Sequence, residues 1–272
     1  MKKKFITIFS VVIVLAAVMF FIVKYMGNAN NSEPISVTTD SVVFKKGCYA
    51  ADSSCLYISF HYPVVDKDKD GQLSMLLNSD FLQMVGDSIK QTTVGTIKEH
   101  LGMIAQQYDS SFIDYNGAFP GGTVNTWYLK VRYNILMNDG KMLSIQYFSD
   151  DYMGGAHGTY RYHYTNLDLK NPSSLTIPDM VTDLVVFAER AEEAFRHHFK
   201  IPEGKNLDNF WFPQGKFILP TEYGFSPEGI ILHYNVYEIA PYSDGDIKVL
   251  IPYSNIKDIL NSKWSYLARV KS

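Results

Sequence analysis

Two short segments concentrate the residues that could do chemistry. One runs from Tyr152 to Gly158 (Tyr-Met-Gly-Gly-Ala-His-Gly), and the other runs from Tyr237 to Tyr242 (Tyr-Glu-Ile-Ala-Pro-Tyr). The imidazole of His157 lies close in sequence to the carboxylates of Asp150 and Asp151, and this combination suits proton transfer or ligation near neutral pH. Both segments are rich in turn residues and lie between strand-like runs, as expected for loops that present polar groups at a fixed place.

Each candidate also has a structural interpretation. Gly154 and Gly155 can adopt positive φ and form a tight connection, in which His157 hydrogen-bonds the neighbouring backbone. Glu238 follows an apolar alternation and precedes Ile-Ala-Pro, so it either ties a loop or faces a cleft. No nucleophile accompanies the histidine, and no serine elbow, zinc-protease motif, phosphate-binding loop or deacetylase-type Asp-Asp with paired histidines is present. We therefore favour a chain that is not an enzyme; the alternative is an enzyme that uses His157 and Glu238.

The two segments could also bind a ligand without catalysing a reaction, because they contain polar, aromatic and glycine residues. The candidate binding residues are Gly154, Gly155, His157, Tyr237, Glu238 and Tyr242. Many aromatic residues on predicted strands could add a recognition face for carbohydrate or protein: Trp127, Tyr128, Tyr160, Tyr162, Tyr164, Trp211, Tyr234, Tyr237 and Tyr242. Taken singly, an aromatic residue on a strand is more often part of the core or of a cross-strand pair.

We expect no metal site and no cofactor. The run from Asp66 to Gly71 resembles the opening of a calcium loop, but Leu77 stands where the loop needs a bidentate acid. The alternating lysines of this run would also weaken the field for a cation. His61, His163 and His233 are isolated on predicted strands, as packed or surface histidines are.

The only cysteines are Cys48 and Cys55, separated by small and polar residues that suit a turn. In an oxidising compartment, a disulfide between them is the expected state. A bridge across so short a loop is expected to contribute on the order of 2 to 3 kcal/mol. It would fix one hairpin and would not support the whole domain.

The N-terminus predicts the location of the chain. Lysines at positions 2–4 precede an apolar run from Phe5 to Val23, which is long enough to cross a bilayer as a helix. The lysines orient the N-terminus toward the cytoplasm and the body away from it. Two interpretations stay open: residues 1–26 form a retained single-pass inner-membrane anchor, or the small residues Gly27 and Ala29 allow cleavage and give a periplasmic or secreted protein.

The composition describes a folded body. Hydrophobic residues make up 46% of the chain and aromatic residues 14%, while the net charge is only −3. This is enough apolar material for a sizeable core, and no basic stripe points to nucleic acid. We predict a linker over 27–34, an N-terminal α+β subdomain over 35–150 and a C-terminal α+β subdomain over 151–262.

Hydrophobic periodicity predicts an α+β fold with antiparallel sheets, a long helical segment and a second helix packed on them. The expected helical segments are 73–108, as one long helix or a pair broken near 92–95, then 178–199 and a short final helix over 253–260. The expected strands are 35–46, 56–62, 123–137, 141–148, 159–169, 216–223, 230–237 and 247–252. Asp139-Gly140 and Glu228-Gly229 predict the turns of two hairpins.

Several motifs resemble one family of extracytoplasmic domains. They are Tyr152–Gly158, Asn166–Leu169, Leu175–Met180, Phe225–Ile230, Tyr237–Tyr242 and Val249–Tyr253. In this order they resemble the domain shared by the lysozyme-binding part of the anti-sigma factor RsiV and the N-terminal region of the peptidoglycan deacetylase PdaC. The resemblance covers roughly residues 56–260 and is most specific after Asp150.

The resemblance implies a binding role. In one relative the domain binds lysozyme, and in the other it accompanies a separate catalytic domain that has no counterpart in this sequence. Only four residues precede the apolar run, so an anti-sigma role is doubtful. We therefore expect a membrane-tethered cell-envelope protein with a non-catalytic binding module, whose partner is a lysozyme-like protein or peptidoglycan. The alternative is a peptidoglycan- or polysaccharide-modifying enzyme that uses His157 and Glu238.

Overall fold

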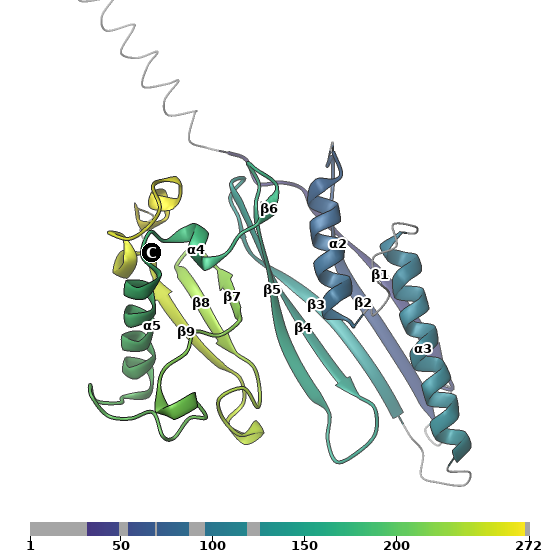
Figure 1. The fold of residues 1–272 in the computed structure, drawn as a ribbon. Helices are drawn as coiled ribbons and strands as arrows, with labels where there is room; N and C mark the ends of the chain where they lie inside the picture. The colour runs from purple at the N-terminus through teal and green to yellow at the C-terminus, as the bar shows by residue number, and fades with distance from the viewer. Residues whose placement is uncertain (1–31, 49–53, 69, 87–95, 119–125, 270–272) are drawn as a thin grey trace, which may run out of the picture.

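The computed structural model describes residues 32–48, 54–68, 70–86, 96–118 and 126–269. It confirms the α+β class, with a six-stranded sheet followed by a three-stranded one (Figure 1). The elements of the first lobe are β1 (Val37–Lys46), β2 (Cys55–Val65), α2 (Gln72–Met84), α3 (Ile97–Ala118), β3 (Thr126–Asn138), β4 (Met142–Tyr152), β5 (Thr159–Asp168) and β6 (Ser173–Ser174). Those of the second lobe are α4 (Ile177–Met180), α5 (Leu184–Phe199), β7 (Glu222–Phe225), β8 (Gly229–Tyr234) and β9 (Ile247–Pro252), with short 3₁₀ turns at Pro213–Gly215, Tyr242–Asp244, Tyr253–Ile256 and Ser262–Arg269.

The larger sheet follows chain order from β1 to β6. Its neighbours are antiparallel except for β2 and β3, which pair in parallel from Cys55↔Thr126 to Phe60↔Val131. A parallel pair requires a crossover, and the segment that contains α2 and α3 supplies it. The helical segment is therefore placed by topology on one face of the sheet.

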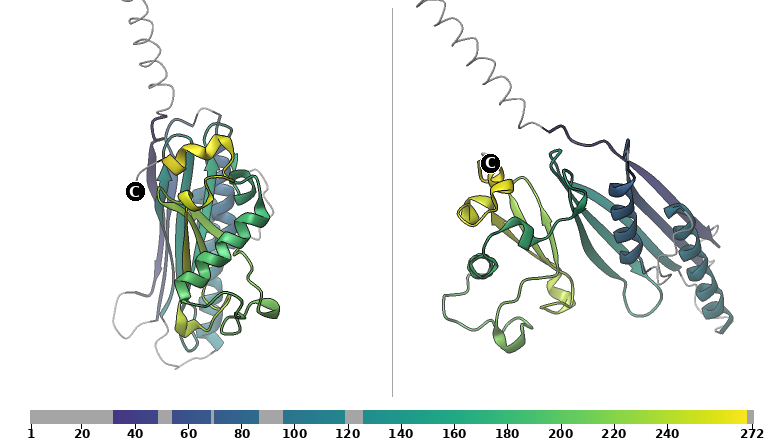
Figure 2. Two further views of the ribbon diagram at one scale, coloured as in Figure 1. Left: turned by 90° about the vertical axis from the view of Figure 1, so that its left-hand side faces the viewer. Right: turned by 45° about the horizontal axis from the view of Figure 1, so that its top comes forward.

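Both helices of the first lobe lie on the same face of this sheet, as the views in Figures 1 and 2 agree. Alternate strand residues supply the sheet's side of the core, for example Ile58, Val131 and Tyr147, all almost fully buried. Phe81 and Leu101 face them from α2 and α3. The predicted helical segment is a pair, and its second helix continues to Ala118, beyond the predicted end.

The Asp139-Gly140 hairpin forms as predicted. The carboxylate of Asp139 accepts hydrogen bonds from the backbone N–H groups of Lys141 and Met142, both at 2.9 Å. Gly140 has a φ of 76°, a conformation that favours glycine. The predicted loop before the first helix also forms: Asp68 accepts the N–H of Ser74 at 2.7 Å, at the start of α2.

The second lobe differs from the prediction in several places, one of which is the short final helix, observed as a 3₁₀ turn over Tyr253–Ile256. The expected helix over 178–199 is interrupted, because Val181 is extended and forms an isolated bridge with Leu260. Asp183 then restarts the helix by accepting the N–H groups of Val185 and Val186. The strand expected over 216–223 is largely irregular, and β7 begins only at Glu222.

The predicted disulfide is present between Cys48 and Cys55. It closes a short loop at the start of β2, and a short loop restricts the unfolded chain only modestly. Replacing both cysteines by serine is expected to lower the free energy of unfolding by about 2–3 kcal/mol, as measured by urea denaturation. An equal stability of the two proteins would show that the bridge does not restrict the unfolded chain.

The predicted subdomain boundary after Asp150 falls inside β4, and β5 pairs with β4 in the larger sheet. The predicted membrane span and most of the linker lie outside the described residues. Within the described ranges, no helix is both long and apolar enough to cross a bilayer.

The second lobe covers the outer edge of β5 with side chains and not with a strand. The side-chain amide of Asn235 accepts from the backbone N–H of Tyr162 at 2.8 Å and donates to its carbonyl at 2.9 Å. Glu222 accepts the backbone N–H of Tyr164 at 3.0 Å. These contacts satisfy the backbone groups of an edge strand and join the two lobes.

Candidate functional site

The face of the larger sheet opposite the helices is lined by aromatic side chains. Strand register places Tyr57, Tyr128 and Tyr152 in one row across β2, β3 and β4. A second row pairs Phe148 with Tyr162 across β4 and β5. We call Tyr57, Tyr128, Phe148, Tyr152, Tyr160 and Tyr162 the tyrosine face; all six side chains are half-buried.

Cations lie over several rings of the tyrosine face. The ammonium of Lys130 is 4.4 Å from the ring centre of Tyr128, and the guanidinium of Arg132 is 4.2 Å from that of Phe148. Lys45 lies 5.1 Å from the ring of Tyr57. Such contacts hold a cation beside an aromatic surface while leaving its donors available. The face therefore combines flat apolar rings with positive charge.

The second lobe extends this face. The ring of Tyr242 lies 5.9 Å from that of Tyr160 and 5.4 Å from that of Tyr237. The ring of Tyr162 lies beneath the ammonium of Lys248, at 3.9 Å. Tyr237 is 52% exposed, so this end of the face is open to solvent.

The candidate residue His157 joins the same cluster. Its ring lies 4.7 Å from that of Tyr242, and its Nδ1 lies 2.7 Å from the carbonyl oxygen of Gly158. The imidazole is exposed. Its contact with the neighbouring backbone is the one expected if His157 has a structural role in the turn. Gly154 and Gly155 form the preceding turn, with φ values of 89° and 99°.

The two neighbouring aspartates lie on opposite faces of the sheet. Asp150 is paired in register with Lys130 and Tyr160 and belongs to the aromatic side. Asp151 lies on the helix side, where burial raises its pKa, the Arg161 guanidinium opposes this, and Asp150 adds to it. Strand alternation therefore prevents the pair from acting as two adjacent carboxylates.

Glu238 is tied into its own loop. Its carboxylate accepts the backbone N–H of Asn235 at 2.8 Å, and its backbone N–H donates to the Asn235 carbonyl at 3.1 Å. Burial raises the pKa of Glu238. In the part of the chain that the structure describes, no hydrogen bond or ion pair joins Glu238 to His157.

The aromatic residues singled out from the sequence separate into groups. Tyr128, Tyr160 and Tyr162 belong to the tyrosine face, whereas Trp127 and Tyr234 are core residues. Tyr57, Phe148 and the cations of this face were not predicted from the sequence. A signal was present, because β3, β4 and β5 carry aromatic residues at positions where a solvent-facing strand usually carries Ser, Thr or Lys.

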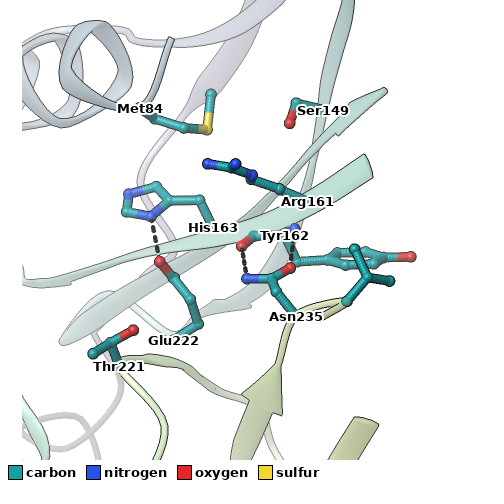
Figure 3. A pocket seen from close by; sticks show the side chains of 9 residues that line it. Met84, Ser149, Arg161, Tyr162, His163, Thr221, Glu222 and Asn235 are labelled. Atoms are coloured by element: carbon teal, nitrogen blue, oxygen red, sulfur yellow. Dashed lines mark hydrogen bonds and ion pairs between the residues drawn. The ribbon is translucent and has the colours of Figure 1, made fainter. Parts of the chain in front are cut away.

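A polar pocket lies between the lobes on the helix side of β5 (Figure 3). It has a volume of about 350 Å³ and is lined by Met84, Ser149, Arg161, Tyr162, His163, Thr221, Glu222, Asn235 and Val236. Its residues come from α2, β4, β5, β7 and the loops next to them. Apart from Tyr162, none of them was proposed as a site residue from the sequence, because they are scattered along the chain.

His163 lies at the centre of an ion cluster beside this pocket. Its Nδ1 is 3.0 Å from Glu222 Oε1, and its Nε2 is 2.8 Å from Asp80 Oδ2. Both nitrogens face carboxylate oxygens, so both must carry a proton. Although burial alone would lower it, the hydrogen bonds to Asp80 and Glu222 raise the pKa of His163 to about 10.

His233 is held in the opposite charge state. It is fully buried, with Nδ1 2.6 Å from the Tyr164 hydroxyl and Nε2 2.9 Å from Asp246. Burial and Lys248 lower its pKa to about 4, against the effect of Asp246. Gln146 donates to the Tyr164 hydroxyl at 2.6 Å. His233 is therefore neutral, and its Nδ1 accepts a hydrogen bond from the Tyr164 hydroxyl, which in turn accepts one from Gln146.

No group of three or more histidine, cysteine or acidic residues within the described ranges is arranged to hold a metal ion. Two acidic residues of the calcium-like loop, Asp66 and Asp68, accept hydrogen bonds from protein groups. The carboxylate of Asp66 accepts hydrogen bonds from the hydroxyls of Ser36 and Thr38.

Two family models match the chain. Residues 49–160 match the model described as Deacetylase PdaC, and residues 173–254 match the model described as Protein of unknown function (DUF3298). The resemblance drawn from the motifs is confirmed in this respect. The two regions meet at β5 and β6.

Two solved structures share the fold. One is a DUF3298 family member from Bacteroides fragilis, 24% identical, with a TM-score of 0.63 over 85% of this chain and 96% of that one. The other is a DUF3298 family protein from Pseudomonas aeruginosa, 18% identical, with a TM-score of 0.61 over 86% of this chain and 98% of that one. A search among curated proteins gives no match.

Proposed function

Because the chain joins a PdaC-type region to a DUF3298 region, we propose that it is a non-catalytic binding module of the bacterial cell envelope. Its ligand is a cell-wall glycan that carries carboxylates, as peptidoglycan does, and the tyrosine face is where the glycan binds. The observation that carries this proposal is the row of half-buried rings with Lys and Arg above them, on a sheet face that no described helix covers.

The chemistry of the face suits such a ligand. Sugar rings have apolar faces of C–H groups that pack on aromatic rings. Carboxylates of the glycan would accept hydrogen bonds from Lys45, Lys130 and Arg132. Each ring is already held by its neighbours, for example Tyr128 by Tyr152 at 6.2 Å. Binding therefore costs little side-chain entropy.

Charge favours a glycan over a basic protein. The cations of the face outnumber its carboxylates, Asp150 and Asp246. A strongly basic partner such as lysozyme would meet like charge here, and like charge opposes association.

The contacts of the former catalytic candidates support binding without turnover. The ring of His157 packs on Tyr242, and the carboxylate of Glu238 caps the backbone of Asn235. Both side chains serve local structure. In this proposal, residues 1–26 anchor the body at the outer side of the inner membrane.

The test measures binding of the full chain, kept in detergent, to soluble muropeptides by calorimetry. The double variant Tyr57→Ala, Tyr128→Ala is expected to bind about tenfold more weakly, because it removes two adjacent aromatic platforms. Trp211→Ala is the matched control. Trp211 is 53% exposed and lies in the loop between α5 and β7, outside the tyrosine face, so its loss should leave affinity unchanged.

Three outcomes would contradict the proposal. The first is that muropeptides do not bind saturably. The second is that Trp211→Ala loses as much affinity as the double variant, and the third is that a modified glycan is released during the titration. Lysozyme is titrated in parallel, and tight binding of lysozyme alone would replace the glycan with a protein partner.

A further inference from the structure

The pocket between the lobes has opposite charges at its two ends. Arg161 extends across it below Met84 and Ser149, His163 lies next to Arg161 on the same strand, and Glu222 lies beyond His163 (Figure 3). The volume of about 350 Å³ is at the lower end of the range for small-molecule sites. A ligand of this pocket is therefore small.

Arg161 is available to a ligand. Among the described residues its guanidinium makes no hydrogen bond or ion pair, and its side chain is exposed. Register places it directly opposite Ser149, whose hydroxyl is a further donor. A guanidinium beside a hydroxyl is a suitable arrangement for binding a carboxylate.

The opposite end carries excess negative charge. Asp80 and Glu222 share one imidazolium, so this ion cluster keeps one negative charge in excess. Glu222 accepts hydrogen bonds from His163 and from the backbone of Tyr164. A carboxylate offers about four acceptor positions, so Glu222 can still accept from an ammonium group.

The charge balance excludes a simple anion as the preferred ligand. Asp151 opposes the charge of Arg161 on the same face of the sheet, and the ion cluster is negative. A lone carboxylate would therefore meet net repulsion, whereas a dipolar molecule would satisfy both ends. Met84 and Val236 supply apolar wall for a short side chain.

We propose that this pocket binds a zwitterionic amino acid or dipeptide, with its carboxylate at Arg161 and its ammonium at Glu222. Arg161 and His163 lie on the opposite side of β5 from the tyrosine face, and Tyr162 is the residue that the two sites share. The pocket would give the module a second ligand, of a different chemical class.

The test is calorimetry of the full chain in detergent with L-alanine, D-alanine and alanylalanine as probes. At least one of them should bind saturably. N-acetylalanine, which lacks the ammonium, and alanine amide, which lacks the carboxylate, should each bind at least tenfold more weakly. Arg161→Gln should weaken the zwitterion by about tenfold or more.

Arg132→Gln is the matched control, because it makes the same exchange on β3 at the tyrosine face. It should leave amino-acid binding unchanged, as should the Tyr57, Tyr128 double variant. Absence of binding by all three zwitterions overturns the inference. The inference is also overturned if N-acetylalanine and alanine amide bind as tightly as the zwitterions, or if Arg161→Gln and Arg132→Gln lose the same affinity.

Discussion

Replacing His163 by glutamine is expected to lower the free energy of unfolding by about 3 kcal/mol at pH 7. The substitution keeps the size of the side chain but removes the cation between Asp80 and Glu222, which then face each other. Removing one partner of a buried ion pair costs about 3–5 kcal/mol. The lower value applies because the His163 side chain is 25% exposed and solvent screens part of the interaction.

The same substitution is expected to change the pH dependence of stability. The pKa of His163 is raised from 6.5 to about 10 in the folded protein. Its stabilising contribution is therefore fully present below about pH 6.5 and is lost as the pH rises toward 10. Urea denaturation of the parent protein between these pH values should show a decline in stability that His163→Gln lacks.

His61→Gln is the control for this prediction. His61 lies on β2 of the same sheet and is exposed, so the same chemical exchange should change neither the stability at pH 7 nor its slope with pH. Parallel pH profiles for the parent protein and His163→Gln would contradict the assignment of the ion cluster.

Replacing Gly224 by alanine is expected to destabilise the protein by about 3 kcal/mol. A Cβ at this position would lie 2.5 Å from Cδ1 of Tyr164 and 2.7 Å from Cδ1 of Leu136. Leu136 can move, but the ring of Tyr164 is held at its hydroxyl by Gln146 and His233. The added methyl group must therefore separate β7 from β5. The expected loss of about 3 kcal/mol is at the upper end of the usual destabilisation by overpacking.

Gly102→Ala provides the matched control, with the opposite expected sign. Gly102 lies inside α3, and a Cβ there meets nothing within 4 Å. Alanine in a helix is favoured over glycine by about 1 kcal/mol, so this variant should be more stable. Thermal unfolding of the two variants, followed by circular dichroism, tests both. Equal effects of the same exchange would show that the contact of Gly224 with Tyr164 is unimportant.

Local patterns were sufficient to predict much of the fold. Alternation predicted most of the strands, Asp139-Gly140 marked a hairpin that forms, and Cys48 and Cys55 form the expected bridge. The interruption of the helix at Val181 was missed because a bridge to Leu260, far along the chain, determines it. Periodicity contains no information about such a partner.

The candidate sites were harder to predict for the same reason. His157 and Tyr242 were correctly placed in loops, and the structure brings their rings together. Asp80, His163 and Glu222 meet from three distant elements, and each is an ordinary residue in its own segment. Their joint chemistry exists only after the two sheets have packed.

The side chains that cover β5 show that the boundary between the two matched regions is not a boundary in the fold. The PdaC match ends at residue 160, just inside β5, and the residues that satisfy its outer edge, Glu222 and Asn235, belong to the DUF3298 match. A chain with the first region alone would lack most of β5, so the edge of β4 that now pairs with β5 would be left open to a neighbouring chain. The two matched regions are therefore joined by strand pairing between β4 and β5 as well as by the side chains that cover β5.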